Sequence, residues 1–270
     1  FHLAAQPLVR KSYKDPLETW ETNVLGTLNL LESLKTINKK CSVVIITTDK
    51  VYKNLNMNCG YREDDELGGH DPYSASKAAC ELAVSSWRES FCGINNELNN
   101  FLKISTARSG NVIGGGDWSE DRIVPDTIKA FKAKIPVSLR NPNHTRPWQH
   151  VLDPLSGYLE LAKENYISND PLCEAFNFGP RIESNTTVND LVEEITKYWP
   201  GKIAKIIKKE SLYESELLHL QIDKSYKLLN WRPNWGFEKS VEYTANWYKK
   251  FYDGKNAYEC TIDDINNFFE

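Results

Sequence analysis

A tyrosine and a lysine stand four residues apart in the stretch GHDPYSASKAACEL, residues 69–82. Asp71 is a good helix N-cap and Pro72 a good first helical residue, so the sequence predicts that a helix starts here. Tyr73 and Lys77 then lie one turn apart on the same face of that helix. An ammonium beside a phenol favours the phenolate, which makes this tyrosine a candidate base near neutral pH. The spacing alone also occurs in ordinary surface helices, so other residues must decide between the two readings.

A second candidate set follows the stretch CSVVIITT, residues 41–48. Its nearly uninterrupted β-branched run is typical of a strand that is buried on both faces of a parallel sheet. Thr48, Asp49 and Lys50 mark the carboxyl end of this strand, and open α/β sheets bind their ligands outside the carboxyl ends of their strands. We interpret the Thr-Asp-Lys turn as a candidate site. The alternative is an ordinary turn at the end of a strand.

The elements around these residues predict the fold class. Residues 15–18 form a capping box with a proline at the first helical position, which predicts an amphipathic helix. The apolar residues at helical spacing are Trp20, Val24, Leu28, Leu31 and Leu34. The stretch LKISTAR, residues 102–108, has the pattern of a further strand. Helices that alternate with strands predict an α/β fold with a doubly wound, Rossmann-like parallel sheet.

Past residue 108 the sequence becomes richer in loops, and such segments tend to carry substrate contacts. Loops are expected over residues 109–118 and 141–151, helices over 124–132, 154–164 and 188–199, and a strand over 175–179. We therefore predict two domains. Residues 1–110 form the first, with the remainder of the Rossmann-like sheet, and residues 111–270 form mainly a smaller mixed α/β substrate domain, with 150–180 returning to the sheet.

Composition limits the classes of partner. The chain has 270 residues, a net charge of −4 and 40% hydrophobic residues, which is ordinary for a globular protein and shows no excess of positive charge for nucleic acid or a membrane surface. Six scattered cysteines include no CxxC pair, so no metal site is predicted. Because the cysteines are scattered, we expect reduced thiols in a cytoplasmic protein. No apolar run has the length of a membrane span.

The first residues, FHLAAQP, read as a strand without an initiator methionine. We therefore expect that the protein has a preceding N-terminal part. The sequence also contains no GxxGxxG turn of the kind that holds a dinucleotide pyrophosphate, since its glycine triad, Gly114–Gly116, comes far too late.

Three segments follow one another along the chain: HLAAQP, then ITTDK at a strand end, then YxxxK at a helix start. Together they resemble the extended short-chain dehydrogenase/reductase family, and the TDK placement resembles its sugar-nucleotide 4,6-dehydratases. Longer motifs narrow the resemblance to the members that act on CDP-glucose, and they run over essentially the whole chain. These motifs are HLAAQPLVRKSY, GYREDDELGGHDPYSASK, RSGNVIGGGDW, DRIVP and RPWQHVLDPLSGYL.

The resemblance implies an NAD-dependent lyase that converts CDP-glucose to CDP-4-keto-6-deoxyglucose and water. It also implies a homodimer and a place in deoxysugar biosynthesis, such as that of lipopolysaccharide O-antigen. A glycine-rich turn precedes HLAA in the family, so a chain lacking that turn is expected to bind NAD poorly by itself.

The same resemblance assigns roles to the catalytic candidates. Tyr73 matches the family's base at the sugar 4-hydroxyl, and Lys77 matches the residue that activates it and holds the nicotinamide ribose. Thr48 matches a residue that hydrogen-bonds the 4-oxygen, and Asp49 matches the acid for the departing 6-hydroxyl. Lys50 stands where many dehydratases have a glutamate base, and a lysine acts as a base only when it is neutral.

Binding residues are assigned in the same way. The resemblance places the cofactor beside Leu3, Ala4, Ala5, Gln6, Thr47, Tyr73 and Lys77. It places the substrate beside Asn111, Arg146 and Glu216, and an arginine suits a diphosphate because its planar fork of donors matches the phosphate oxygens. Asn23, within the first helix, is expected to bond either loop backbone or a ligand.

Two other readings remain open from the sequence. A nucleotide-sugar epimerase of the same superfamily shares the tyrosine and the lysine but does not need the Asp49 and Lys50 pair. A non-catalytic nucleotide-binding fragment is expected if the chain cannot hold NAD.

Overall fold

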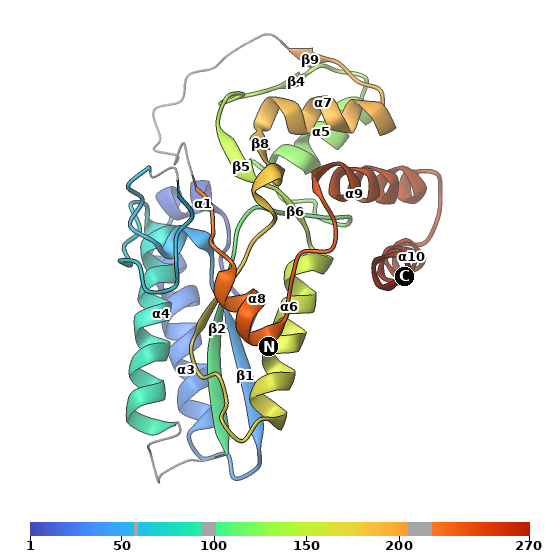
Figure 1. Ribbon diagram of the computed structural model, residues 1–270. Helices are drawn as coiled ribbons and strands as arrows, with labels where there is room; N and C mark the ends of the chain where they lie inside the picture. The colour runs from blue at the N-terminus through green and yellow to red at the C-terminus, as the bar shows by residue number, and fades with distance from the viewer. Residues whose placement is uncertain (57–58, 93–100, 205–217) are drawn as a thin grey trace. The chain divides into compact units, whose positions relative to one another are not determined.

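The structure is a computed structural model that describes residues 1–56, 59–92, 101–204 and 218–270 (Figure 1). These residues form two compact units. Unit 1 consists of Phe1–Gly110, Leu155–Phe178 and Leu220–Arg232, and unit 2 consists of Asn111–Pro154, Gly179–His219 and Pro233–Glu270.

The elements of unit 1 are α1 (Val9–Lys14), α2 (Pro16–Trp20), the π-helical turn η1 (Glu21–Leu25), α3 (Gly26–Leu34), β1 (Cys41–Ile46), the 3₁₀ turn η2 (Asp49–Val51), α4 (Pro72–Phe91), β2 (Leu102–Ser109), most of α6 (Leu152–Ile167), β7 (Ala175–Phe178) and α8 (Asp223–Leu229). Those of unit 2 are β3 (Val112–Ile113), α5 (Ile123–Lys132), β4 (Val137–Ser138), β5 (Thr145–Pro147), β6 (Gln149–His150), η3 (Ile182–Ser184), β8 (Asn185–Thr187), α7 (Val188–Tyr198), β9 (Ile203–Ala204), α9 (Phe237–Tyr252) and α10 (Ala257–Phe269). None of the helices in the described ranges has both the length and the apolar character that a membrane span requires.

A parallel sheet lies at the centre of unit 1, with its strands in the order β1-β2-β7. Val43 pairs with Ile104 in β2, and Thr106 of β2 pairs with Ala175 in β7. The N-terminal segment lies beside β1, because His2 forms a parallel bridge with Ile45. The strands predicted over 41–48, 102–108 and 175–179 are thereby confirmed.

Side chains of β1 alternate between two apolar cores, as the pleat of a strand requires. Val43 and Ile45 pack in one cluster with Leu31 of α3 and Val84 of α4. Val44 faces the other cluster, which also contains Tyr158, Leu161, Phe176, Phe178 and Trp231. Figure 1 shows α3 and α4 on one face of this sheet and α6 on the other. The predicted doubly wound α/β class is confirmed.

The first predicted helix differs from the expectation. It is divided into α2, η1 and α3, and its first half buries a polar stripe formed by Thr19, Asn23 and Thr27 instead of the apolar one. Trp20 remains 39% exposed, and Leu31 is the predicted apolar residue that is fully buried. The polar stripe is tolerated because its side chains hydrogen-bond the N-terminal segment and α4, which leaves few buried polar groups unpaired.

Residues 220–232 belong to unit 1, although no sequence signal predicted this. Leu220 forms a bridge with Tyr61, and Ser225 Oγ donates a hydrogen bond to the backbone carbonyl of Asn177 in β7. Trp231 packs edge to face against Phe178. This return of the chain covers the end of β7.

The glycine triad serves packing within unit 2. A Cβ on Gly114 would lie 2.8 Å from Val151 Cγ1, and one on Gly115 would lie 2.0 Å from Trp247 Cδ2. Gly116 has a φ of +82°, which side chains rarely adopt. The triad therefore lets the loop after β3 approach α9 closely.

Gly157 of α6 allows a similar close approach in unit 1, where an added Cβ would lie 2.3 Å from Phe178 Cδ1. Gly157→Ala should lower the free energy of unfolding by about 1–3 kcal/mol, because the β7 ring or the helix must shift. Gly26→Ala is the matched control, since a Cβ there has its nearest neighbour at 3.8 Å. That variant should stay within about 1 kcal/mol of the wild type. Equal unfolding midpoints of the two variants in urea would contradict this packing account.

Candidate active site

The start of α4 is fixed by capping contacts on both sides. The Asp71 carboxylate accepts a hydrogen bond from the Ser74 N–H at 3.0 Å, and Pro72 occupies the first turn, as predicted. The N–H of Tyr73 donates to Ser12 Oγ of α1 at 3.1 Å. Tyr73 itself is 8% exposed. The tyrosine is therefore held at the buried beginning of its helix and is not an ordinary surface residue.

Lys77 lies one turn further along α4, and its Nζ donates a hydrogen bond to the carbonyl of Ile46, the last residue of β1, at 3.1 Å. The side chain is buried. Burial lowers the pKa of Lys77, and the nearby Cys80 and Glu81 oppose that effect. The structure thus brings the lysine of the YxxxK motif to the carboxyl end of β1.

The Thr48–Asp49 pair immediately follows this strand end. Thr48 caps η2 and donates from its hydroxyl to Asp49 Oδ1 at 3.0 Å. Asp49 is 1% exposed, and its other oxygen, Oδ2, is buried without a hydrogen-bond partner among the described residues. A buried carboxylate oxygen without a hydrogen-bond partner is unusual, and it makes Asp49 a candidate for contact with a ligand.

Lys50 is the more accessible member of the turn, with 26% of its side chain exposed. Its Nζ lies 3.8 Å from Asp49 Oδ1. An ammonium is attracted to a carboxylate at this distance, whereas a neutral amine gains little from it. The contact matches the alternative in which Lys50 pairs with a neighbouring carboxylate, and the base role stays a prediction.

The residues predicted to meet the cofactor follow the bridge between His2 and Ile45. Leu3 and Ala4 are exposed and Ala5 is half-buried, which leaves a small apolar surface beside β1. Gln6 is turned inward, because its amide nitrogen donates to Leu8 O and Thr19 Oγ1. The small side chains fit the close approach of a flat cofactor ring.

Asn23 holds this segment in place. Its Oδ1 accepts from the N–H of Gln6 at 2.8 Å, and its amide nitrogen donates to Gln6 O and to Ser76 Oγ of α4. Of the two expectations for Asn23, bonding to loop backbone is the one that the structure contains.

Thr47 precedes Thr48, and its hydroxyl points to a buried carboxylate that the sequence analysis did not single out. This carboxylate belongs to Glu81, which is 2% exposed. Its Oε1 accepts from Thr47 Oγ1 and from Arg108 Nε at 3.0 Å, and its Oε2 accepts from Thr106 Oγ1 at 2.7 Å and from Arg108 Nη2 at 3.0 Å. Burial by itself raises the pKa of Glu81, but Arg108 and the two threonines outweigh it, so the pKa lies below its ordinary value.

The guanidinium of Arg108 extends the hydrogen-bond network to the loop after β1 and, through Tyr52, to β7. Arg108 Nη1 donates to Tyr52 Oη at 2.8 Å and to the carbonyl of Glu63 at 3.0 Å. Tyr52 Oη donates in turn to Asn177 Oδ1 at 2.7 Å. One sequence signal for this network existed: Glu81 comes four residues after Lys77, on the same face of the predicted helix.

A second buried pair lies at the end of β2. Ser109 Oγ and Tyr158 Oη are 2.6 Å apart. Burial raises the pKa of Tyr158 to about 12, and the charge of Tyr73 contributes in the same direction. No local pattern predicts this neighbour of the candidate base Tyr73, because Tyr158 lies in a helix 85 positions further along the chain.

The substrate candidates belong to unit 2. The carbonyl of Asn111 accepts from the N–H of Gln149 at 3.1 Å, and Asn111 Oδ1 is buried without a hydrogen-bond partner in the described ranges. Arg146, on β5, is 9% exposed and donates from Nη1 to the carbonyl of Thr145. Because Gln149 follows Arg146 by three residues, the two candidates lie on neighbouring segments of one unit. Glu216 lies outside the described residues.

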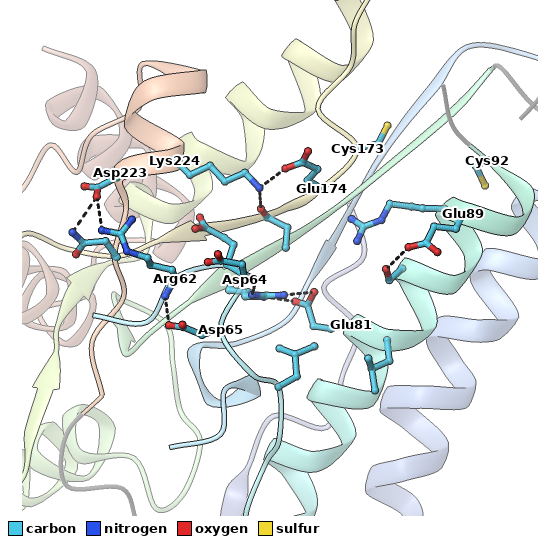
Figure 2. A pocket seen from close by; sticks show the side chains of 18 residues that line it. Arg62, Asp64, Asp65, Glu81, Glu89, Cys92, Cys173, Glu174, Asp223 and Lys224 are labelled. Atoms are coloured by element: carbon cyan, nitrogen blue, oxygen red, sulfur yellow. Dashed lines mark hydrogen bonds and ion pairs between the residues drawn. The ribbon is translucent and has the colours of Figure 1, made fainter. Parts of the chain in front are cut away.

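Unit 1 also contains a cavity of about 1040 Å³, shown in Figure 2. Its wall is strongly charged and includes Glu81 and Arg108 together with the ion pair between Arg62 and Asp223. None of the predicted catalytic residues lines it. The cavity is therefore distinct from the strand-end site and meets it through the Glu81–Arg108 pair.

Two solved structures of nucleotide-sugar enzymes resemble this chain in fold. The chain superposes on UDP-glucuronic acid 4-epimerase from Bacillus cereus, in complex with UDP-glucuronic acid and NAD, with a TM-score of 0.80, 22% identity and coverage of 93% of this chain and 75% of that one. It superposes on dTDP-glucose 4,6-dehydratase from Bacillus anthracis, in complex with NAD, with a TM-score of 0.72, 22% identity and coverage of 89% and 71%. The fold is thus that of the Rossmann-type epimerases and dehydratases.

The family follows from the sequence matches. The profile of GDP-mannose 4,6 dehydratase matches residues 1–244, and the chain therefore belongs to this family. It is 40% identical to CDP-glucose 4,6-dehydratase of Salmonella typhimurium over 269 residues, which cover 99% of this chain and 75% of that protein. It is 23% identical to UDP-glucose 4-epimerase of Mycoplasma genitalium, with 94% and 76% covered.

Replacement of Arg108 should show how much the buried Glu81 carboxylate destabilises the fold when it has no partner. Arg108→Met should lower the free energy of unfolding by about 3–5 kcal/mol, because Glu81 is left buried and unpaired. Without Arg108, burial dominates and the pKa of Glu81 rises above its unfolded value, so the folded protein binds a proton more tightly than the unfolded one. The destabilisation relative to wild type should then be smaller near about pH 5 than near about pH 8.

Urea unfolding at the two pH values measures this difference. The double variant Glu81→Met with Arg108→Met is the control, and it should lose the pH dependence. A destabilisation by Arg108→Met that does not change with pH would contradict the assigned pair.

Proposed function

We propose that this protein is a CDP-glucose 4,6-dehydratase, which converts CDP-glucose to CDP-4-keto-6-deoxyglucose and water. The observation that carries the proposal is the 40% identity to a protein of that activity over 99% of the chain. The geometry supports it, because Lys77 of α4 and the Thr48–Asp49 turn meet at the carboxyl end of β1, and α4, which also carries the buried Tyr73, packs against that turn.

NAD is the cofactor that this reaction requires, and when bound it accepts a hydride from sugar carbon 4 and returns it to carbon 6. Leu3, Ala4 and Ala5 would hold it through their exposed apolar surface. Gln6 and Thr47 would border the same site, and Lys77 would hold the ribose. The small side chains and the inward turn of Gln6 fit this assignment.

Tyr73 removes the proton from the sugar 4-hydroxyl in the oxidation step. The charge of Lys77 stabilises the phenolate, and the hydrogen bond from its Nζ to Ile46 O holds that charge at the strand end. Thr48 hydrogen-bonds the 4-oxygen. In the structure the Thr48 hydroxyl donates to Asp49 Oδ1, and it would turn from this carboxylate to the 4-oxygen.

Elimination needs a base at carbon 5 and an acid at the 6-hydroxyl, because the carbon-5 proton is acidic once carbon 4 is a ketone. Asp49 gives its proton to the departing hydroxyl, which leaves as water. Its uncommitted Oδ2 supports this role. Lys50 takes the proton from carbon 5, directly or through a water, provided that it is neutral at that step.

Arg146 binds the diphosphate of the substrate and Asn111 its sugar, and we assign Glu216 to the nucleotide ribose. The nearly buried guanidinium of Arg146 and the unpartnered Oδ1 of Asn111 support the first two assignments. In domain terms, residues 1–110 form the NAD-binding domain and residues 111–270 mainly the substrate domain.

An exposed apolar surface on α2, η1 and α4 bears on the assembly of the protein. Large apolar side chains remain exposed on two helices that pack together, namely Leu17, Trp20 and Leu25 of α2 and η1 and Leu82 of α4. We assign this surface to a second copy of the chain in a homodimer, and we place the enzyme in the cytoplasm. Light scattering after size exclusion tests the dimer, and a Leu82→Lys variant should shift it toward the monomer.

The experiment that tests the function is incubation of the protein and NAD with CDP-glucose, followed by NMR of the sugar. A 4-keto-6-deoxy product from CDP-glucose, with slower turnover of the UDP, GDP and dTDP analogues, is expected. A 4-epimer with its 6-hydroxyl intact would instead identify an epimerase. Binding of CDP without any sugar chemistry would identify a nucleotide-binding protein that is not an enzyme.

Tyr73→Phe should lower kcat by about 10²–10⁴-fold, because the variant loses the general base while its ring still fills the same space. KM should change little. Tyr61→Phe is the matched control: Tyr61 is also buried in unit 1, and its hydroxyl bonds Asn54 and Leu55 away from the strand end. Steady-state kinetics of both variants measure the effect, and near-normal kcat in Tyr73→Phe would refute the assignment of the base.

Two variants of Lys50 separate a base from an ion-pair partner. If Lys50 is the base, both Lys50→Ala and Lys50→Arg should oxidise carbon 4 yet fail to exchange the carbon-5 proton with solvent deuterium. An arginine keeps the charge but does not act as a base near neutral pH. NMR of the recovered sugar should then show a 4-ketone that retains its 6-hydroxyl.

A different result would follow if Lys50 only pairs with Asp49 or with substrate phosphates. Lys50→Arg would then keep most of the turnover, and Lys50→Ala would slow every step together. Normal carbon-5 exchange in Lys50→Arg would show that another group is the base.

A further inference from the structure

Glu81 continues the helix face that carries the proposed catalytic pair. Tyr73, Lys77 and Glu81 follow one another at intervals of four residues in α4, so they occupy successive turns of one face. All three are buried. The face thus carries a phenol, an ammonium and a carboxylate in a row toward the sheet.

The last two of these side chains bond two consecutive residues of the same strand end. Lys77 Nζ bonds Ile46 O at 3.1 Å, and Glu81 Oε1 accepts from Thr47 Oγ1. The next two residues are Thr48 and Asp49. Any shift of α4 along β1 would therefore move Tyr73 relative to the proposed acid, and Glu81 opposes such a shift because its two bonds from Arg108 fix it to β2.

We propose that Glu81 is a positioning residue for the dehydratase reaction: it fixes the Thr48–Asp49 turn against Tyr73 and supplies the negative charge that faces Lys77. This inference rests on the proposed function, and the family match assigns no role to Glu81. A positioning role differs from a purely structural one because it connects the Glu81 carboxylate to the charge of Lys77.

The groups around Lys77 come from three elements. Cys80 and Glu81 belong to α4, and both raise the pKa of Lys77 against the larger effect of burial. His2, beside β1, has its pKa lowered first by burial and then by Lys77, so it faces the same ammonium. Arg108 of β2 pairs with the Glu81 carboxylate. Removal of the carboxylate charge therefore takes a counter-charge from Lys77 and leaves the buried Arg108 without its partner.

Glu81→Gln should reduce kcat about tenfold with KM within about threefold, because the reacting groups lose their alignment while substrate contacts remain. The pKa of Lys77 should fall, since the counter-charge of Glu81 is lost. A lysine that must be charged loses its function as pH rises through its pKa. The alkaline limb of the pH–rate profile should therefore move to lower pH.

Matched controls separate this role from loss of a buried hydrogen bond. Thr106→Val removes a bond to the same carboxylate from β2, away from the strand-end turn, and Tyr52→Phe removes a bond to Arg108. Both should lower the unfolding midpoint and leave kcat and the pH profile unchanged. Thr47→Val removes the bond to the strand end, so it should lower kcat more than Thr106→Val does, without a shift of the profile because the charges remain.

A direct titration of Lys77 provides a readout that needs no turnover. NMR of protein labelled with carbon-13 at lysine Cε, with the Lys77 signal assigned from a Lys77→Arg spectrum, should show the lower pKa in Glu81→Gln. If wild type titrates as expected but converts no CDP-glucose, the proposed function fails and the link between Glu81 and Lys77 stands.

Two results would overturn the inference. One is a folded Glu81→Gln protein whose Lys77 titration and kcat equal those of wild type. The other applies if Glu81→Gln does not fold: a Thr47→Val variant that loses no more kcat than Thr106→Val would show that the bond to the strand end positions nothing.

Discussion

The ion pair between Glu81 and Arg108 is the constraint on which unit 1 depends. Two charges taken out of water cost several kcal/mol each, and only excellent geometry offsets that cost. Here the fork of Arg108 meets both carboxylate oxygens, and the hydroxyls of Thr47 and Thr106 supply two further bonds. The pair joins α4 to β1 and β2, so the helix that carries the proposed base has one position relative to the strand ends.

The proposed chemistry follows from that position. Lys77 reaches the last carbonyl of β1, and the Thr48–Asp49 turn begins two residues later. A parallel sheet opens at the carboxyl ends of its strands, so groups placed there face a ligand without a change of fold. Asn23 fixes the neighbouring N-terminal segment through Gln6 and Ser76. Each of these groups is thus held by hydrogen bonds of its own.

Much of this arrangement could be predicted from local patterns, and some of it could not. The β-branched run of β1 and the Asp71–Pro72 cap of α4 are short-range signals, and both elements formed as predicted. The polar stripe formed by Thr19, Asn23 and Thr27 was missed because its partners lie up to 53 residues away, as with Asn23 and Ser76. The Glu81–Arg108 pair was missed for the same reason, since burial and pairing are tertiary properties. The roles of Thr48, Asp49, Lys50, Tyr73 and Lys77 remain predictions that kinetics must test.

The most direct test of the central claim follows one hydrogen atom. The proposed reaction removes hydrogen from carbon 4 of CDP-glucose and returns the same hydrogen to carbon 6. With CDP-glucose that carries deuterium at carbon 4, the 4-keto-6-deoxy product should contain that deuterium in its methyl group, and NMR or mass spectrometry of the sugar detects it. A product whose methyl group carries only hydrogen, or deuterium that returns to carbon 4 with inverted configuration, would contradict the assignment.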